Sequence, residues 1–294
     1  MAFKKVFDRH FLGDPKQRDY GLDDQPHTRR ELFQTVFAVR AGRMTGYSLI
    51  YSLAWLPAII WSSIVLLKLF ALLNGGAALD TAQMQSIGMG YALIMMPLVT
   101  VTGPFHMAAS YVMRNWARDE HADLTLDYRY AWKKNWKQGL MYSFSNGVLI
   151  PVMFFYLSVL SVKAQTNALF YLPIAVLIFM LLFWQLCCMI IPTMCVTYKL
   201  SYRQIVRNAI IISCAQLFRA IGVWLVTMIV PIIAVAICCL EDSAALWAFP
   251  CVAVFNAVFG FGLRRLICAS YANMVCEKYI NSKIDGAPTD IGLR

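Results

Sequence analysis

Residues 168–196, ALFYLPIAVLIFMLLFWQLCCMIIPTMCV, form one long apolar run without a charged side chain. A helix needs about 20 apolar residues to cross the hydrocarbon layer of a bilayer, because each residue adds a rise of only about 1.5 Å. This run is long enough, and an uninterrupted run of this length is typical of a membrane span rather than of a buried soluble helix. The stretch therefore predicts an all-α membrane protein.

The rest of the chain contains further runs of the same kind. Of all residues, 60% are hydrophobic and only 14% are charged, whereas roughly a quarter of a soluble domain is charged. We predict a polytopic helix bundle with about six transmembrane helices. The spans cover about 47–67, 87–113, 139–160, 168–196, a stretch ending near 240, and 245–263. The fifth span begins somewhere between Ala209 and Gly222.

Lysine and arginine fall on alternate connections between these runs. The chain carries 26 of them and has a formal net charge of +10. Nearly all lie before residue 46, in 114–138, in 197–219 or after residue 263, whereas 74–86 and 241–244 contain none. Because cytoplasmic connections are enriched in Lys and Arg, both termini are predicted to be cytoplasmic. The basic excess thus has a topological explanation and requires no nucleic-acid partner.

This topology divides the chain into three parts. Residues 1–46 form a cytoplasmic amino-terminal segment, 47–276 a six-span membrane domain and 277–294 a cytoplasmic tail. Span two contains Pro97, Gly103 and Pro104, which predict a break or kink because proline removes a backbone donor.

The cytoplasmic connection 114–138 mixes aromatic and charged side chains. Read as a helix from about Leu124, it places the aromatic rings on one face and Lys133 and Lys137 on the other. Trp and Tyr suit a membrane interface and Lys suits anionic headgroups. We therefore expect an amphipathic cytoplasmic helix on the inner leaflet or a surface that docks a partner. The candidate residues are Arg118, Asp119, Tyr128, Trp132, Lys133, Asn135, Trp136 and Lys137.

Few polar side chains fall within the predicted spans. The candidates for an intramembrane role are His106, Asn146, Gln185 and Arg219. An ionisable residue in a span is a functional hypothesis. Amides, however, also hydrogen-bond between packed helices, and an arginine near the end of a span extends to the interface. A transport or proton-relay role and a packing role therefore both stay open.

The sequence predicts no catalytic, metal-binding or cofactor-binding residue. No Asp or Glu lies deep in a predicted span, which disfavours acid–base catalysis within the membrane. The nine cysteines form no CxxC pair, and no histidine is spaced to complete a zinc site. We therefore predict a non-enzymatic protein without a cofactor.

Residues 97–138, PLVTVTGPFHMAASYVMRNWARDEHADLTLDYRYAWKKNWKQ, resemble the YesL-like family of bacterial integral membrane proteins, a family of unknown function. That family shows a Pro–x–Val–Thr–x–Gly run, an Ala-rich segment with a Tyr, an Arg–Asp pair and an aromatic–Lys–x–Asn–aromatic–x–Gln segment. The matching positions are Pro97, Val99, Thr100, Gly103, Ala109, Tyr111, Arg118, Asp119, Lys133, Asn135, Trp136 and Gln138. A less specific match covers 191–210, at Pro192, Tyr198, Leu200, Gln204 and Asn208.

The resemblance implies a protein of the bacterial cell (cytoplasmic) membrane. Members often occur beside carbohydrate-import components of the ATP-binding-cassette type, which implies an accessory subunit whose partners are the lipid bilayer and importer permease subunits. The chain itself has no Walker A motif and no clear permease coupling motif. A stand-alone transporter or channel for a small solute is the alternative. A membrane enzyme or a lipid-binding protein is a third hypothesis, which a polar cavity joining His106 and Arg219 would favour.

Overall fold

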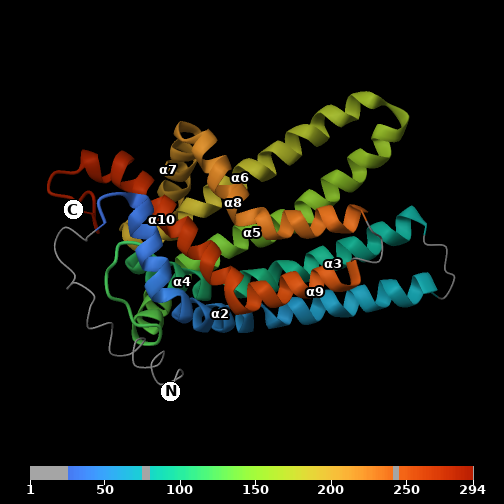
Figure 1. Ribbon diagram of the computed structural model, residues 1–294. Helices are drawn as coiled ribbons and strands as arrows, with labels where there is room; N and C mark the ends of the chain where they lie inside the picture. The colour runs from blue at the N-terminus through green and yellow to red at the C-terminus, as the bar shows by residue number, and fades with distance from the viewer. Residues whose placement is uncertain (1–25, 75–79, 241–244, 294) are drawn as a thin grey trace, which may run out of the picture.

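The computed structural model describes residues 26–74, 80–240 and 245–293, and every regular element in these ranges is helical (Figure 1). The main helices are α2 (Arg29–Asn74), α3 (Thr81–Val101), α4 (Gly103–Trp116), α5 (Leu126–Thr166), α6 (Tyr171–Thr197), α7 (Tyr202–Ala215), α8 (Leu217–Leu240), α9 (Ala245–Phe255) and α10 (Phe261–Tyr279). Short helical turns cover Ala168–Phe170, Asn256–Gly260 and Asn281–Lys283.

Six helical segments are long and apolar enough to cross a membrane. They are Arg29–Leu72, Thr81–Val101, Leu126–Thr166, Ala168–Thr197, Leu217–Leu240 and Pro250–Lys283. Many large apolar side chains on them are exposed, for example Leu67 at 68% and Phe179 at 62%. Exposing so much apolar surface to water is unfavourable, and lipid contact removes that penalty. The predicted all-α class and the count of about six spans are confirmed.

Span two is broken where the sequence predicts it. Helix α3 ends at Val101 and α4 begins at Gly103, with Pro104 in its first turn. The Thr102 hydroxyl donates to the carbonyl of Val99 at 2.8 Å. The two helices therefore meet at a corner, and the side chains around it face several neighbouring helices.

Helices α4 and α5 pack backbone to backbone beside this corner. A Cβ atom built on Gly103 would overlap the carbonyl oxygen of Gly139, and one on Gly139 would lie 2.7 Å from the carbonyl oxygen of Gly103. Only glycine permits such an approach. This contact fixes the position of α4 on α5.

The expected amphipathic helix is not a separate element. The stretch from Leu126 to Gln138 is the first part of α5 and continues without interruption into the third predicted span. No proline separates the two parts, and Gly139 is retained inside the helix because α4 packs against it. The segment therefore extends span three beyond the apolar region instead of forming a helix of its own.

Asp123 caps the beginning of α5. Its carboxylate accepts hydrogen bonds from the Thr125 hydroxyl and from the backbone N–H groups of Leu126 and Thr125. These bonds favour the charged form and lower the pKa of Asp123 to about 2. A lowered pKa means that the cap is present above the ordinary carboxyl range and is lost as the pH falls through about 2. The start of α5 is therefore capped at neutral pH.

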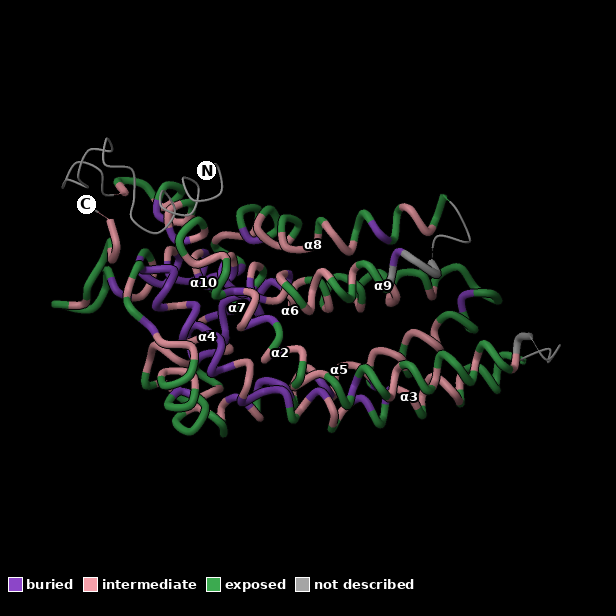
Figure 2. Tube along the Cα trace, turned by 60° about the horizontal axis from the view of Figure 1, so that its bottom comes forward, coloured by how far each residue is buried: buried purple, intermediate pink, exposed green. Residues whose placement is uncertain are grey.

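The core lies at the end of the bundle that carries the charged connections. Figure 2 shows buried residues gathered around α4, α6, α7 and α10, while the far ends of α3 and α5 are mostly exposed. One cluster is built around Ile190, Met194 and Val275 of α6 and α10. Another joins α2, α4 and α10 through Met44, Trp116 and Leu266, among others. The bundle is thus packed tightly at one end and exposes apolar side chains at the other.

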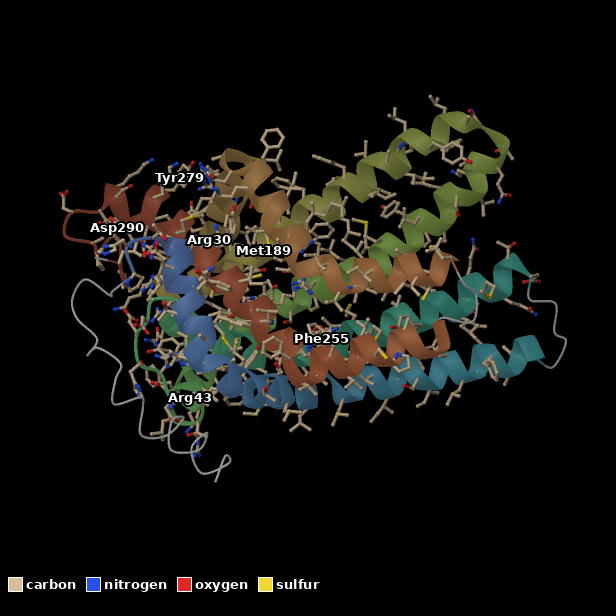
Figure 3. All side chains as sticks on the ribbon, viewed as in Figure 1. Arg30, Arg43, Met189, Phe255, Tyr279 and Asp290 are labelled. Atoms are coloured by element: carbon tan, nitrogen blue, oxygen red, sulfur yellow. The ribbon has the colours of Figure 1, made fainter. Side chains whose placement is uncertain are left out.

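The start of α2 and the carboxyl-terminal segment meet at this same end. Arg29 pairs with Glu277, and its Nη1 also donates to the carbonyl of Ile291 at 2.9 Å. Figure 3 shows Arg30 of α2 at the same end of the molecule as Tyr279 and Asp290. This arrangement agrees with an even number of spans, which places the first and the last span's outer ends on the same side of the membrane. Residues 1–25 of the predicted amino-terminal segment lie outside the described residues.

The last two spans differ in their boundaries. Helix α8 begins at Leu217, inside the predicted interval. The sixth span does not end at residue 263, because α9 continues through a π-helical turn, Asn256–Gly260, into α10. Arg264 and Arg265, which follow the predicted end of the sixth span, therefore lie inside a long helix.

Candidate functional site

A cavity of about 450 Å³ lies between the helices at the corner of α3 and α4. Its walls come from α2, α3, α4, α5, α6 and α10, so segments from both halves of the chain build it. The aromatic lining residues are Tyr47, Tyr51, Trp55, Tyr142 and Phe261. The polar ones include Thr102, His106, Ser143, Asn146, Gln185, Arg264 and Arg265. The cavity therefore combines apolar walls with a small group of hydrogen-bonding side chains.

His106 of α4 lies between Tyr51 of α2 and Arg265 of α10. Its Nδ1 is 2.6 Å from the Tyr51 hydroxyl, and its Nε2 is 2.9 Å from Arg265 Nη1. A guanidinium can only donate, so Nε2 must accept and the imidazole must be neutral with its proton on Nδ1. This assignment follows from the hydrogen bonds. Because Arg265 occupies Nε2, His106 orients the arginine and is poorly suited to relay protons.

Arg265 is a buried cation without a carboxylate partner. It is only 6% exposed, its Nε has no hydrogen-bond partner, and its Nη2 lies 3.5 Å from both the Met189 carbonyl and the Thr193 hydroxyl. Met189 is labelled near the middle of the molecule in Figure 3. Within the described ranges, the ion pairs involve neither Arg265 nor Arg264. A buried charge without an opposite charge beside it carries a desolvation penalty of several kcal/mol.

The walls contributed by α3, α4 and α5 carry the family signal. Residues 64–159 match the family described as a protein of unknown function, DUF624. This match is consistent with the YesL-like resemblance and covers about a third of the chain. His106 and Asn146 lie within the DUF624 segment, whereas Arg264 and Arg265 lie beyond it. No curated protein and no solved structure matches the chain.

Two predicted intramembrane amides also face the cavity, Asn146 within the DUF624 segment and Gln185 after it. Asn146 Oδ1 accepts from Trp184 Nε1 at 2.9 Å, and its Nδ2 donates to the Tyr142 carbonyl at 2.9 Å. Asn146 therefore holds α5 against α6. The side-chain amide of Gln185 makes no hydrogen bond within the described ranges. Its amide is thus available to a ligand.

The fourth predicted intramembrane residue, Arg219, is not part of the cavity. Its Nη1 lies 3.9 Å from Met274 Sδ on the exposed side of α8. His106 and Arg219 therefore do not meet in one cavity, the arrangement that would have favoured the third hypothesis, and Arg265 contacts His106 instead. Apolar or small residues continue after the arginine pair at helical spacing, at Leu266, Ala269, Ala272 and Cys276. That pattern indicates that the helix continues past the arginine pair, although it does not identify the contacts that bury Arg265.

The docking or interfacial candidates predicted in 118–137 include packing residues and surface residues. Arg118 is 8% exposed. Tyr128 donates to the Phe105 carbonyl at 3.2 Å, and the Asn135 amide donates to the Ala131 carbonyl at 3.1 Å. Asp119 has a φ of 56° and lies 3.8 Å from Arg40 Nη2. Arg118 and Tyr128 therefore pack against neighbouring segments, whereas the Asp119 side chain is 54% exposed and the Asn135 bond lies within its own helix.

The remaining candidates are exposed on the first part of α5, within the DUF624 segment. Trp132 is 37% and Trp136 43% exposed, and Lys133 and Lys137 are exposed beside them. The Lys137 ammonium lies 5.6 Å from the Trp136 ring centroid. This surface combines aromatic rings with positive charge, as expected for a membrane interface or a docking site.

Proposed function

We propose that this chain is a non-enzymatic membrane protein that binds a small ligand in the cavity between its helices. The observation that supports this is the cavity itself, about 450 Å³ in volume, with aromatic walls and a few convergent polar groups. Small-molecule sites typically have such a volume and such a lining. No carboxylate lines it in the described residues, so the cavity favours binding over acid–base chemistry.

Filling the cavity tests this proposal. Ile150→Trp adds volume at a lining residue, whereas Ile178→Trp makes the same change at a side chain on α6 that is 45% exposed and outside the cavity. Native mass spectrometry of protein purified in a mild detergent is expected to show a bound small molecule in the wild type and in Ile178→Trp, and a loss in Ile150→Trp. Equal occupancy in all three, or no adduct in any, contradicts the proposal.

A second candidate concerns the cytoplasmic surface. We propose that the chain works in the bacterial cytoplasmic membrane as an accessory to a carbohydrate importer of the ATP-binding-cassette type. The family resemblance and the exposed Lys133, Trp136 and Lys137 support this role. Affinity purification with mass spectrometry is expected to recover importer permeases with the wild type, and fewer with Trp136→Ala. Recovery of the chain alone contradicts it, and solute uptake by vesicles that hold only this chain favours a stand-alone transporter.

A further inference from the structure

We propose that the ligand of the cavity is an anionic amphiphile. Its oxyanion group, a phosphate or a carboxylate, lies beside Arg264 and Arg265, and its apolar chain lies in the groove between α5 and α6. This inference rests on the proposed function of the cavity as a ligand site and adds the chemical class of the ligand.

The charge of the cavity supports the anionic group. Arg265 is more than nine-tenths buried and has an unpaired Nε, and Arg264 is an exposed arginine of the same wall. No Asp or Glu lines the cavity in the described residues to neutralise either charge. Charge-assisted hydrogen bonds from a guanidinium to an oxyanion are among the strongest in proteins, and they strengthen where water is excluded. A ligand with an oxyanion therefore supplies the missing counter-charge.

His106 prepares Arg265 for this role. Its Nε2 accepts from Nη1 of the guanidinium, while Tyr51 holds Nδ1 on the other side of the ring. The imidazole ring also stacks on Tyr142, with centroids 5.2 Å apart. These contacts restrain the arginine before a ligand arrives, which reduces the entropy lost on binding. A neutral histidine restrains Arg265 without cancelling its positive charge.

A second cavity supports the apolar chain. It measures about 370 Å³ and is bordered by α5, α6 and Ile210 of α7. Apart from Ser145, its lining side chains are apolar or aromatic, and Phe179 and Met180 on its border are 62% and 57% exposed. The two cavities share Leu149, Met153 and Leu181. A polar site thus adjoins an apolar groove that is open towards the surrounding lipid.

Lipid competition tests the inference. Protein in detergent is mixed with equal amounts of phosphatidylglycerol and phosphatidylcholine that carry the same acyl chains, and bound lipid is counted by native mass spectrometry. We expect the wild type to retain phosphatidylglycerol with a preference of roughly tenfold or more, the effect of one charged hydrogen bond. Arg265→Gln and Arg264→Gln are each expected to lower this preference. Arg219→Gln, a matched change at an exposed arginine on α8, is expected to leave it unchanged.

A test with inorganic phosphate distinguishes an oxyanion that belongs to a lipid from a free oxyanion in solution. Inorganic phosphate has the charge but no apolar chain, so it is not expected to raise the thermal midpoint of the delipidated protein. Stabilisation by phosphate that depends on Arg265, without lipid binding, overturns the amphiphile. If both lipids bind equally and Ile150→Trp abolishes the binding of both, the ligand is not selected for its negative charge. The proposal that the cavity is a ligand site then still holds. If no lipid and no anion binds, the proposed function fails as well. Should Arg265→Gln not fold, Arg265→Lys must keep the preference and the exposed Arg264→Gln must lower it.

Discussion

Replacing Gly103 with leucine is expected to destroy the packing of α4 on α5. Any side chain at this position overlaps the carbonyl oxygen of Gly139 and lies within 2.9 Å of the Ser143 hydroxyl. The obstructing atom is backbone, so the two helices must separate, which costs about 3 kcal/mol or more. Native proteins are stable by only about 5–15 kcal/mol. We expect a large loss of monodisperse protein in size-exclusion chromatography and a much lower thermal midpoint.

Gly90→Leu provides the matched control for this substitution. Gly90 lies in α3, and a Cβ built on it meets nothing within 4 Å. Leucine also has a higher helix propensity than glycine. This variant is expected to be as stable as the wild type. Equal thermal midpoints for Gly103→Leu and Gly90→Leu would show that the close contact of α4 with α5 does not support the fold.

Replacing Arg265 with methionine is expected to stabilise the ligand-free protein. Arg265 is buried without a carboxylate, and replacing buried ionic groups by apolar side chains of similar volume is often neutral or stabilising, by up to about 1–4 kcal/mol. The lost hydrogen bond to His106 offsets part of this, since an unsatisfied acceptor costs about 1–3 kcal/mol. The thermal midpoint of delipidated protein should rise, while the stabilisation by added phosphatidylglycerol should disappear.

Two controls separate charge from packing at this position. Arg265→Lys keeps the positive charge, so the midpoint of the ligand-free protein should not rise. Arg219→Met changes an exposed arginine whose Nη1 lies 3.9 Å from Met274 Sδ, so its midpoint should stay close to that of the wild type. A lower midpoint of ligand-free Arg265→Met than of wild type would mean that the arginine is fully compensated within the protein. The cavity would then lack a free positive charge.

The features that depend on local sequence were predictable. Each span must cross the hydrocarbon layer with a continuous apolar run, so a stretch such as 168–196 can be recognised as a span from its sequence. The break between α3 and α4 was also predictable, because Gly103 and Pro104 weaken the helix wherever they stand. His106, Asn146 and Gln185 were recognisable as polar side chains within spans, but their meeting at one cavity depends on how the helices pack.

The features that depend on contacts between distant residues were not predictable in the same way. The approach of Gly103 to Gly139 arises only when α4 and α5 meet. Arg265 was placed after the end of the sixth span, among the basic residues of a cytoplasmic segment, whereas contacts with α4 and α6 bury it in the bundle. Arg118 and Tyr128 were predicted as docking or interfacial residues, and the structure places them in contacts with neighbouring segments. The chemistry of these side chains suits both packing within the fold and docking at the surface, and only the neighbouring residues in the structure distinguish the two roles.

An electron cryomicroscopy map of the protein purified from its own membrane, without added lipid, tests the central claim most directly. The uncompensated charge of Arg265 and Arg264 predicts ligand density next to these side chains, extending past Leu149 and Leu181 into the groove between α5 and α6. A map with only water-sized features in the cavity, or with a carboxylate side chain of this chain placed against Arg265, would contradict it.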